Sequence, residues 1–310
     1  MFRAIAIVFF TASIANPAFA AQSVSLPAWV CTHPDAIFVS ELEAGESLVP
    51  HDPTHGTGGA TGTTSHTLRI AGLGTGTQTY YLYVPTNYTP TQPMPFVLAL
   101  HGYVAYGTQN SEAQNILSAW SAAAGTGEFI VAAPVGNDIV YQDGLPYGVS
   151  WLVPPTSGPN DYDLFAAVLS DVEAHYNIDR TRISGWGFSA GGHVMHDLGV
   201  NDYSSAFNAS TMAGYSVSSG VLAALACGGM TMAECSAVIN ALPRKIPVDS
   251  HIGTSDPNYS YAAADRTLFT SDGWIDNRTF FWNTFAGAHT YTTADLQLAW
   301  THLCADAVTQ

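Results

Sequence analysis

The chain has 310 residues, and 24 acidic residues against 8 lysines and arginines give it a formal net charge of −16. Such an acidic surface repels nucleic acid and anionic lipid headgroups, so we expect no nucleic-acid partner. The length suits one large α/β domain with additional segments. Neutral or apolar molecules are therefore the expected partners, and the sequence does not indicate an oligomeric state.

Residues 1–20 have the three parts of a secretory signal peptide. Arg3 supplies a positive start, residues 4–14 are apolar, and Ala18-Phe19-Ala20 fits a cleavage site. The apolar run is shorter than the about 20 residues that span a bilayer. We therefore expect a secreted protein, extracellular or periplasmic, that begins at Ala21 and has no integral membrane association.

All four cysteines lie after the expected cleavage site. Export makes two disulfides the default, and four cysteines allow three pairings. Cys227 and Cys235 flank a short segment and are expected to pair locally, in which case Cys31 and Cys304 would join the N-terminal segment to the last helix. No Cys-x-x-Cys spacing supports a zinc site, and we expect no metal.

Residues 21–66 form an N-terminal extension whose second half, from His51 to Ser65, is rich in Gly and Thr and is expected to be a loop. His51, Asp52 and His55 could bind a metal. No third ligand group or helical framework accompanies them, so we expect an exposed polar loop.

From Thr67 onward, strand patterns alternate with helix patterns, which predicts a mainly parallel sheet with helices on both faces, an α/β fold over residues 67–310. One aromatic-rich strand looks antiparallel (78–84), and two apolar runs look buried on both faces (96–100 and 129–134). Further strands are expected at 181–184, 207–212, 247–252 and 278–285, and a long loop at 141–159. Helices are expected at 110–124, 161–176, 190–198 and 295–307, with Asn160 or Asp161 capping the second of them.

Gly187-Phe188-Ser189-Ala190-Gly191 fits G-x-S-x-G, the motif of a nucleophile elbow. In such an elbow a sharp turn between a strand and a helix exposes the serine hydroxyl. The pattern alone occurs by chance in roughly one of five chains this rich in Gly and Ser. Here a short strand precedes it and a helix follows, so we take Ser189 as the candidate nucleophile.

A serine nucleophile needs a base, and the base needs an acid that orients it, in the chain order Ser, acid, His for this fold. The acid should lie just after a strand. Asp256 does so, whereas Asp249 lies within a strand and is expected to face the core or a neighbour. Asp272 and Asp276 precede the last strand, so Asp256 is the predicted acid.

Two histidines follow Asp256 in the chain. His289 lies on the loop that leaves the last strand, whereas His302 is inside the final helix and is expected to be packed or exposed there. His193 and His196 follow the serine on its own helix and would point away from the position of a base. His289 is therefore the predicted base.

An oxyanion hole needs two N–H donors directed at the developing negative charge. Ala190, the residue after the nucleophile, is expected to give one. The loop after the strand at 96–100 should give the other, with Tyr103 as first choice and Gly102 as second, although His101-Gly102 alone could be an ordinary turn.

Aromatic residues lie on the loops where this fold places its pocket. We expect Tyr106, Trp151 and His101 to contact the substrate, although core packing is equally expected for Trp151, and Trp186 could also be core. Aromatic walls with few cations favour short or flat acyl groups. No apolar lid is evident, so long-chain triglycerides are expected to be poor substrates.

The chain resembles secreted α/β-hydrolases of the poly(3-hydroxybutyrate) depolymerase and feruloyl esterase group. The resemblance covers roughly residues 67–304, and it rests on Tyr80-Tyr81-Leu82-Tyr83-Val84-Pro85, Leu100-His101-Gly102, Tyr176-Asn177-Ile178-Asp179, the elbow with Gly192, Gly253-Thr254-Ser255-Asp256-Pro257 and Gly287-Ala288-His289-Thr290. It implies an α/β-hydrolase fold and hydrolysis of carboxylic esters through an acyl-serine, without a metal or organic cofactor. We recognise no counterpart of residues 21–65 in the family, and we expect no separate polymer-binding module after the catalytic domain, so polyester, soluble oligomers and small esters are all open as substrates.

Three other functions compete with a hydroxyalkanoate esterase. A feruloyl or acetyl-xylan esterase would act on plant cell-wall esters with the same residues. A prolyl-oligopeptidase-like peptidase shares the elbow and the triad order but would need a propeller-length N-terminal domain. A non-catalytic binding protein would have no need of intact Ser, Asp and His at all three positions.

Overall fold

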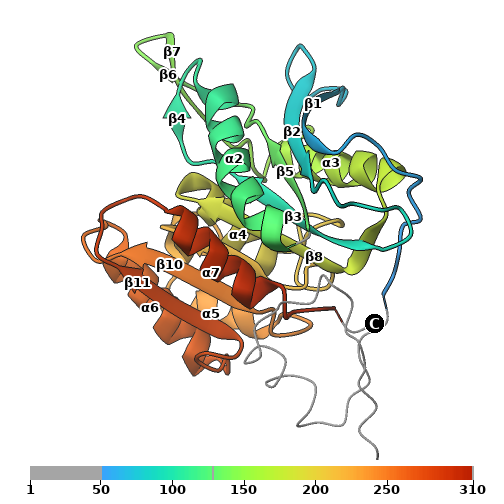
Figure 1. Cartoon of the computed structure of the whole chain (residues 1–310). Helices are drawn as coiled ribbons and strands as arrows, with labels where there is room; N and C mark the ends of the chain where they lie inside the picture. The colour runs from blue at the N-terminus through green and yellow to red at the C-terminus, as the bar shows by residue number, and fades with distance from the viewer. Residues whose placement is uncertain (1–50, 128, 309–310) are drawn as a thin grey trace, which may run out of the picture.

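The computed structural model describes residues 51–127 and 129–308, so the expected signal peptide and Cys31 lie outside the described residues. An eight-stranded sheet runs through this part of the chain (Figure 1). In spatial order the strands are β1 (Gly62–Leu68), β2 (Gln78–Val84), β5 (Ile130–Pro134), β3 (Met94–Leu100), β8 (Ile178–Phe188), β9 (Tyr215–Ser218), β10 (Val248–Gly253) and β11 (Phe280–Phe285). The last six in this order are parallel, and β1 and β2 add an antiparallel edge, as expected for the strand at 78–84.

Helices cover both faces of this sheet, which makes the fold the expected α/β-hydrolase fold (Figure 1). One face carries α2 (Gln109–Gly127) and α7 (Thr293–Leu303). The other carries α3 (Asp161–His175), α4 (Ala190–Val200), α5 (Met232–Asn240) and α6 (Tyr259–Ser271), with a short 3-10 helix, η1 (Leu222–Ala224). None of the helices among the described residues has the length and apolar character needed to cross a bilayer.

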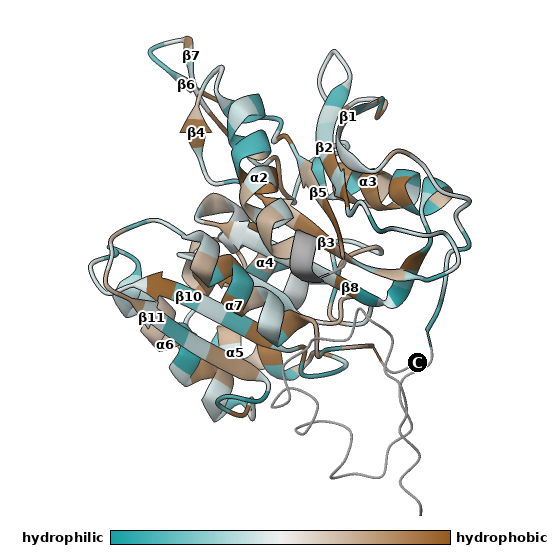
Figure 2. Cartoon of the chain, in the orientation of Figure 1, coloured by the Kyte–Doolittle hydropathy of each residue, from teal (hydrophilic) through white to brown (hydrophobic). Residues whose placement is uncertain are grey.

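The position of the central strand β3 explains its apolar sequence. All seven of its residues are buried, because helices lie on both of its faces, and the strand is largely brown in the hydropathy view (Figure 2). A strand in this position must be apolar at every residue rather than at alternate ones. The continuous apolar run at 96–100 therefore predicted its place correctly.

Helix α3 begins with the capping expected near residue 160. The Asn160 side chain accepts a hydrogen bond from the Tyr162 N–H at 2.8 Å, and the Asp163 carboxylate accepts one from the Asn160 N–H. Asn160 is therefore the cap. Asp161 instead accepts hydrogen bonds from Asn137 and from the Leu152 N–H, and burial raises the pKa of its carboxyl to about 7.

The prediction of a strand at 207–212 is wrong. This segment forms bends and turns, and the strand of this region is β9, at Tyr215–Ser218. The Asn208 side-chain oxygen Oδ1 accepts hydrogen bonds from the N–H groups of Ser210 and Thr211. The Asn208 backbone oxygen accepts one from the Met212 N–H at 3.0 Å, so the backbone is used in a local turn. Phe207 and Met212 are apolar because the turn packs them into the core.

The long loop expected at 141–159 is also wrong in its first half. β6 (Asp138–Gln142) and β7 (Leu145–Ser150) form a hairpin that pairs with the short β4 (Val104–Ala105) in a separate three-stranded sheet. Its two-residue turn has positive φ at Asp143 (51°) and Gly144 (79°). Asp-Gly is the preferred sequence for that turn, and this signal was available in the sequence.

The N-terminal part of the described chain is more ordered than a loop. β1 begins at Gly62, inside the Gly/Thr-rich stretch, and pairs with β2 along its whole length. Further upstream, Pro53 forms a bridge with Asp179, and the His51 ring contacts the buried Asp179 carboxylate. The backbone of Arg180 also bonds to Asp52, so the segment is fixed to the start of β8.

The local disulfide between Cys227 and Cys235 is confirmed, with Cα atoms 5.4 Å apart. It closes the connection between η1 and α5. The second expected bridge, Cys31–Cys304, has one partner outside the described residues and stays a prediction.

Candidate active site

Ser189 lies at a sharp turn between β8 and α4, the position that the elbow motif predicts. Its φ of 52° and ψ of −115° are unfavourable for a residue with a side chain and cost on the order of 1–3 kcal/mol. The flanking glycines are needed because strand and helix meet closely. A Cβ on Gly187 would lie 2.1 Å from the Gly191 oxygen, and one on Gly191 would lie 2.5 Å from the Leu100 oxygen.

The structure brings the three predicted triad residues together. His289 Nε2 lies 2.8 Å from Ser189 Oγ, and His289 Nδ1 lies 3.0 and 3.2 Å from the two oxygens of Asp256. The Asp256 side chain is buried, whereas that of His289 is 35% exposed. An acid behind a histidine that reaches a serine hydroxyl is the geometry that activates a serine nucleophile.

Two residues that the sequence interpretation did not include hold Asp256 in place. Ser219 Oγ donates to one carboxylate oxygen at 2.6 Å, and the Asn258 N–H donates to the other at 2.8 Å. The Asn258 amide also donates to the Ser219 backbone oxygen. Ser219 directly follows β9, so correct placement of that strand would have drawn attention to it.

The loops that carry Asp256 and His289 are joined to one another by their backbones. They leave the adjacent parallel strands β10 and β11, whose last paired residues are Gly253 and Phe285. The Ser255 N–H donates to the Gly287 oxygen at 2.8 Å. A Cβ on Gly253 would lie 2.4 Å from the Ala288 oxygen, so glycine permits this close approach. The separation of acid and base is thereby fixed by the sheet.

The segments expected to form the oxyanion hole border the serine. Ala190 is the first residue of α4. Gly102 follows β3, and a Cβ built on it would lie 3.2 Å from the Cβ of Ser189. Tyr103 comes next in the chain, with an exposed side chain. The backbone of this loop thus passes directly beside the hydroxyl.

His101 and Trp151 were expected to contact the substrate, but the structure packs their rings against each other inside the protein. Both are buried, with ring centroids 4.4 Å apart. Trp151 Nε1 donates to the His101 backbone oxygen at 2.8 Å, and its ring packs edge-on against Phe165 of α3. The loop that follows β7 therefore runs into the core, where the buried Trp151 packs against the residue that follows β3.

The other two aromatic candidates, Trp186 and Tyr106, differ in burial. Trp186 is fully buried and donates to Ser218 Oγ at 3.1 Å, so it belongs to the core. Tyr106 is exposed and lies just beyond β4, with its N–H bonded to the Tyr147 oxygen. Contact between Tyr106 and the substrate therefore stays a prediction.

The histidines on the serine's own helix have structural partners, as their direction predicted. His193 Nδ1 accepts a hydrogen bond from the Val221 N–H at 3.0 Å, and burial lowers its pKa to about 4. His196 lies in the core against Tyr215 and Phe269, and burial lowers its pKa to about 3. Both rings are neutral at pH 7.

Asp249, His251 and His302 form a buried group whose ligand atoms could hold a metal ion. His251 Nε2 lies 2.6 Å and His302 Nδ1 2.8 Å from the Asp249 carboxylate, which are hydrogen-bond distances. Ser216 and Asn283 donate to the same two oxygens. Burial opposes the His251 imidazolium, but the Asp249 carboxylate outweighs it and raises the pKa of His251. We interpret the group as a hydrogen-bond network between β10 and α7, in which the buried His251 Nδ1 has no hydrogen-bond partner. The inward position of Asp249 agrees with the expectation.

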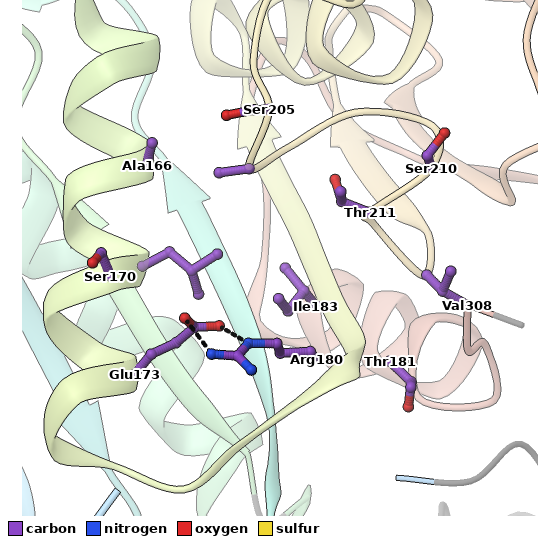
Figure 3. Close-up of a pocket in the computed structure, with 12 residues that line it drawn as sticks. Ala166, Ser170, Glu173, Arg180, Thr181, Ile183, Ser205, Ser210, Thr211 and Val308 are labelled. Atoms are coloured by element: carbon purple, nitrogen blue, oxygen red, sulfur yellow. Dashed lines mark hydrogen bonds and ion pairs between the residues drawn. The ribbon is translucent and has the colours of Figure 1, made fainter. Parts of the chain in front are cut away.

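A cavity of about 500 Å³ lies away from the triad (Figure 3). It is bordered by α3 and the start of β8, and Arg180 and Glu173 form an ion pair across its lower part, with contacts of 2.9 and 3.2 Å. Ser189 follows the opposite end of β8. Ligands in open α/β sheets bind beyond the carboxyl ends of the strands, so this cavity is not the candidate active site.

Comparison with known proteins agrees with this geometry. The sequence model of the family described as putative esterase matches residues 75–286. The chain belongs to this family. As an esterase it is a serine hydrolase acting on ester bonds, and its matched region contains Ser189 and Asp256 but ends before His289. None of the curated proteins matches the sequence.

Solved structures with the same fold include a feruloyl esterase module from Clostridium thermocellum, in complex with sinapinate. It is 18% identical, with a TM-score of 0.55, over 84% of this chain and 94% of that chain. A fluorophosphonate-binding serine hydrolase of Staphylococcus aureus is 15% identical, with a TM-score of 0.56, over 79% and 98% of the two chains. At these identities the similarity establishes the α/β-hydrolase fold alone.

Proposed function

We propose that this esterase is secreted and hydrolyses carboxylic esters through an acyl-serine intermediate formed on Ser189. The observation that carries the proposal is the contact of 2.8 Å between His289 Nε2 and Ser189 Oγ, with Asp256 on the other ring nitrogen. His289 removes the hydroxyl proton as Ser189 attacks the ester carbonyl. Asp256 holds the ring in the tautomer with a proton on Nδ1 and stabilises the imidazolium that forms.

The negative charge that develops on the carbonyl oxygen needs two donors. In this proposal the Ala190 N–H is one and the Tyr103 N–H the other, with Gly102 as the alternative. His289 then gives its proton to the leaving alcohol, and a water molecule repeats the sequence to release the acid. No cofactor is needed, because the charge is stabilised by backbone groups.

For the substrate we propose hydroxyalkanoate polyester or its oligomers and other short-chain esters. The uncharged ring of Phe188, whose centroid lies 5.1 Å from that of His289, and the low number of cations support this class, since neither provides a partner for a free carboxylate. The second candidate is a feruloyl ester of plant cell walls, which is supported by the names of several solved structures of the same fold. Methyl ferulate, hydroxybutyrate oligomers and p-nitrophenyl esters of increasing chain length distinguish the two.

The nucleophile is tested by Ser189→Ala. Turnover of p-nitrophenyl acetate should fall by about 10³-fold or more, because only the oxyanion donors and binding remain. The wild type should also react covalently with a fluorophosphonate probe, and the variant should not. The Ser170→Ala protein, which changes an exposed serine on α3 and keeps the triad and its hydrogen-bond partners, is the matched control and should still be labelled.

Near-normal turnover by a folded Ser189→Ala protein would contradict the mechanism. Amide turnover that exceeds ester turnover would instead indicate a peptidase.

A further inference from the structure

The three-stranded sheet of β4, β6 and β7 projects from the main body at the top of the view (Figure 1). Half of the large apolar side chains that are exposed among the described residues lie on this small sheet and next to the two ends of β4. Leu145 and Tyr141 are 70% and 61% exposed. We call this surface the hairpin platform, and its exposed residues are Tyr103, Tyr106, Ile139, Tyr141, Leu145 and Tyr147.

The base of the platform is fixed rather than loosely attached. The Gly136 N–H, between β5 and β6, donates to His101 Nε2 at 3.0 Å, and Trp151, just after β7, donates to the His101 oxygen. The Tyr103 ring lies against Gly148 so closely that a Cβ there would be 1.9 Å from its hydroxyl. Both ends of the hairpin are therefore anchored at the end of β3.

The platform is continuous with the candidate active site. Gly102 borders Ser189, Tyr103 is the next residue, and β4 begins immediately after it at Val104. A molecule that lies along the platform would therefore reach the serine at one end. Exposed apolar groups clustered beside a catalytic centre mark a surface that contacts a partner.

Charge identifies the kind of partner. Residues 101–109 and 138–150 contain no lysine or arginine, and Asp138 and Asp143 are their only acidic residues. The protein as a whole carries a net charge of −16, so a negatively charged surface would be repelled and a positive one would find few partners on the platform. The complement of this surface is uncharged and apolar.

We propose that the hairpin platform adsorbs the enzyme to the surface of a solid, uncharged aliphatic polyester and so presents ester bonds to Ser189. The aliphatic side chains Ile139 and Leu145 stand among the tyrosines, which favours polyester over a polysaccharide, whose hydroxyls need polar partners. The inference deepens the proposed function and rests on it for the nature of the reaction. It assigns polymer binding to the catalytic domain itself.

The test measures adsorption without turnover. The Ser189→Ala protein is mixed with films of poly(3-hydroxybutyrate), and the bound fraction is compared with that of a protein that also carries Tyr141→Ser, Leu145→Ser and Tyr147→Ser. The three platform substitutions should weaken film binding at least about tenfold, because they remove most of the apolar area. In the active enzyme they should slow film hydrolysis in proportion and leave p-nitrophenyl acetate turnover unchanged.

The matched control replaces three apolar residues elsewhere that are more than half exposed, Met232, Tyr261 and Ile275, by serine. It should bind films like the parent. Equal film binding by the platform variant and the parent, or binding to xylan particles in place of films, overturns the adsorption proposal. Failure of the wild type to hydrolyse soluble esters would instead contradict the esterase function, which adsorption of the Ser189→Ala protein does not test.

Discussion

His101 shows how one buried ring supports the reacting groups without touching them. Its Nε2 accepts the Gly136 N–H, so the proton is on Nδ1, which donates to the Gly102 oxygen at 2.6 Å. Burial lowers the pKa of His101 to about 4, and the ring is neutral at pH 7. This neutral ring therefore fixes the carbonyl of Gly102, the residue that borders Ser189.

Replacement of His101 by Phe should keep the packing against Trp151 but remove both ring hydrogen bonds. Because displacement of a catalytic group by about 1 Å can cost 10²-fold in rate, we expect kcat to fall by about 10–100-fold with little change in KM. Steady-state kinetics with p-nitrophenyl acetate measure the two constants. Trp151→Phe, which leaves His101 intact, should have a smaller effect on kcat. A lower melting temperature with unchanged kcat would mean that His101 is only structural.

The elbow is a property of two elements, β8 and α4, and of the strand β3 beside them. Glycines where β8, α4 and β3 meet let the backbones of these elements approach closely. The atoms that a Cβ would contact differ from one glycine to another. At Gly191 they are the backbone oxygens of Leu100 and His101, at 2.5 and 2.7 Å. At Gly185 the closest atom is Met195 Sδ, at 2.4 Å, which belongs to a flexible side chain.

Gly185→Ala and Gly191→Ala should therefore differ in their effect on stability. We expect the Gly185 variant to lose about 1–2 kcal/mol in free energy of unfolding, because Met195 can move. The Gly191 variant should lose more than about 3 kcal/mol and most of its activity, since α4 must move away from β3 and take Ser189 with it. Urea unfolding and ester turnover provide the measurements. Equal losses in the two variants would show that backbone contact is not the limiting factor.

Two buried ionisable groups have pKa shifts that change the stability of the whole fold in opposite directions as the pH falls. Burial lowers the pKa of His196 from 6.5 to about 3, so between these pH values the unfolded chain binds the extra proton and acid destabilises the fold. Burial raises the pKa of Asp265 from 3.8 to about 7, so in that window the folded protein holds the extra proton and acid stabilises it.

These opposite signs can be separated with two neutral substitutions. Between pH 7.5 and pH 5, the stability of the wild type should fall by about 2 kcal/mol relative to His196→Gln and rise by about 2–3 kcal/mol relative to Asp265→Asn. Urea unfolding at the two pH values gives each difference. Differences that do not change with pH would mean that the two groups titrate alike in the folded and unfolded states.

Sequence by itself determined the fold class, the turn at Ser189 and the three residues, Ser189, Asp256 and His289, that the structure brings together. These features depend on local rules that act within a few residues. A strand buried on both faces is apolar throughout, as at 96–100, and an elbow needs small residues at fixed spacing around its serine. The acid and base then follow, because Asp256 and His289 each come directly after a strand of a parallel sheet.

Only the tertiary structure decided which polar and aromatic residues are buried. Trp151 and His101 are residue types that often line pockets, but α3 and the end of β3 enclose them. Ser219 holds Asp256 across 37 positions of sequence, and Phe207 enters the core from a turn that resembles a strand in composition. Burial and hydrogen bonding depend on groups brought together from distant parts of the chain. A local sequence pattern does not identify those neighbours, because it covers only a few consecutive residues.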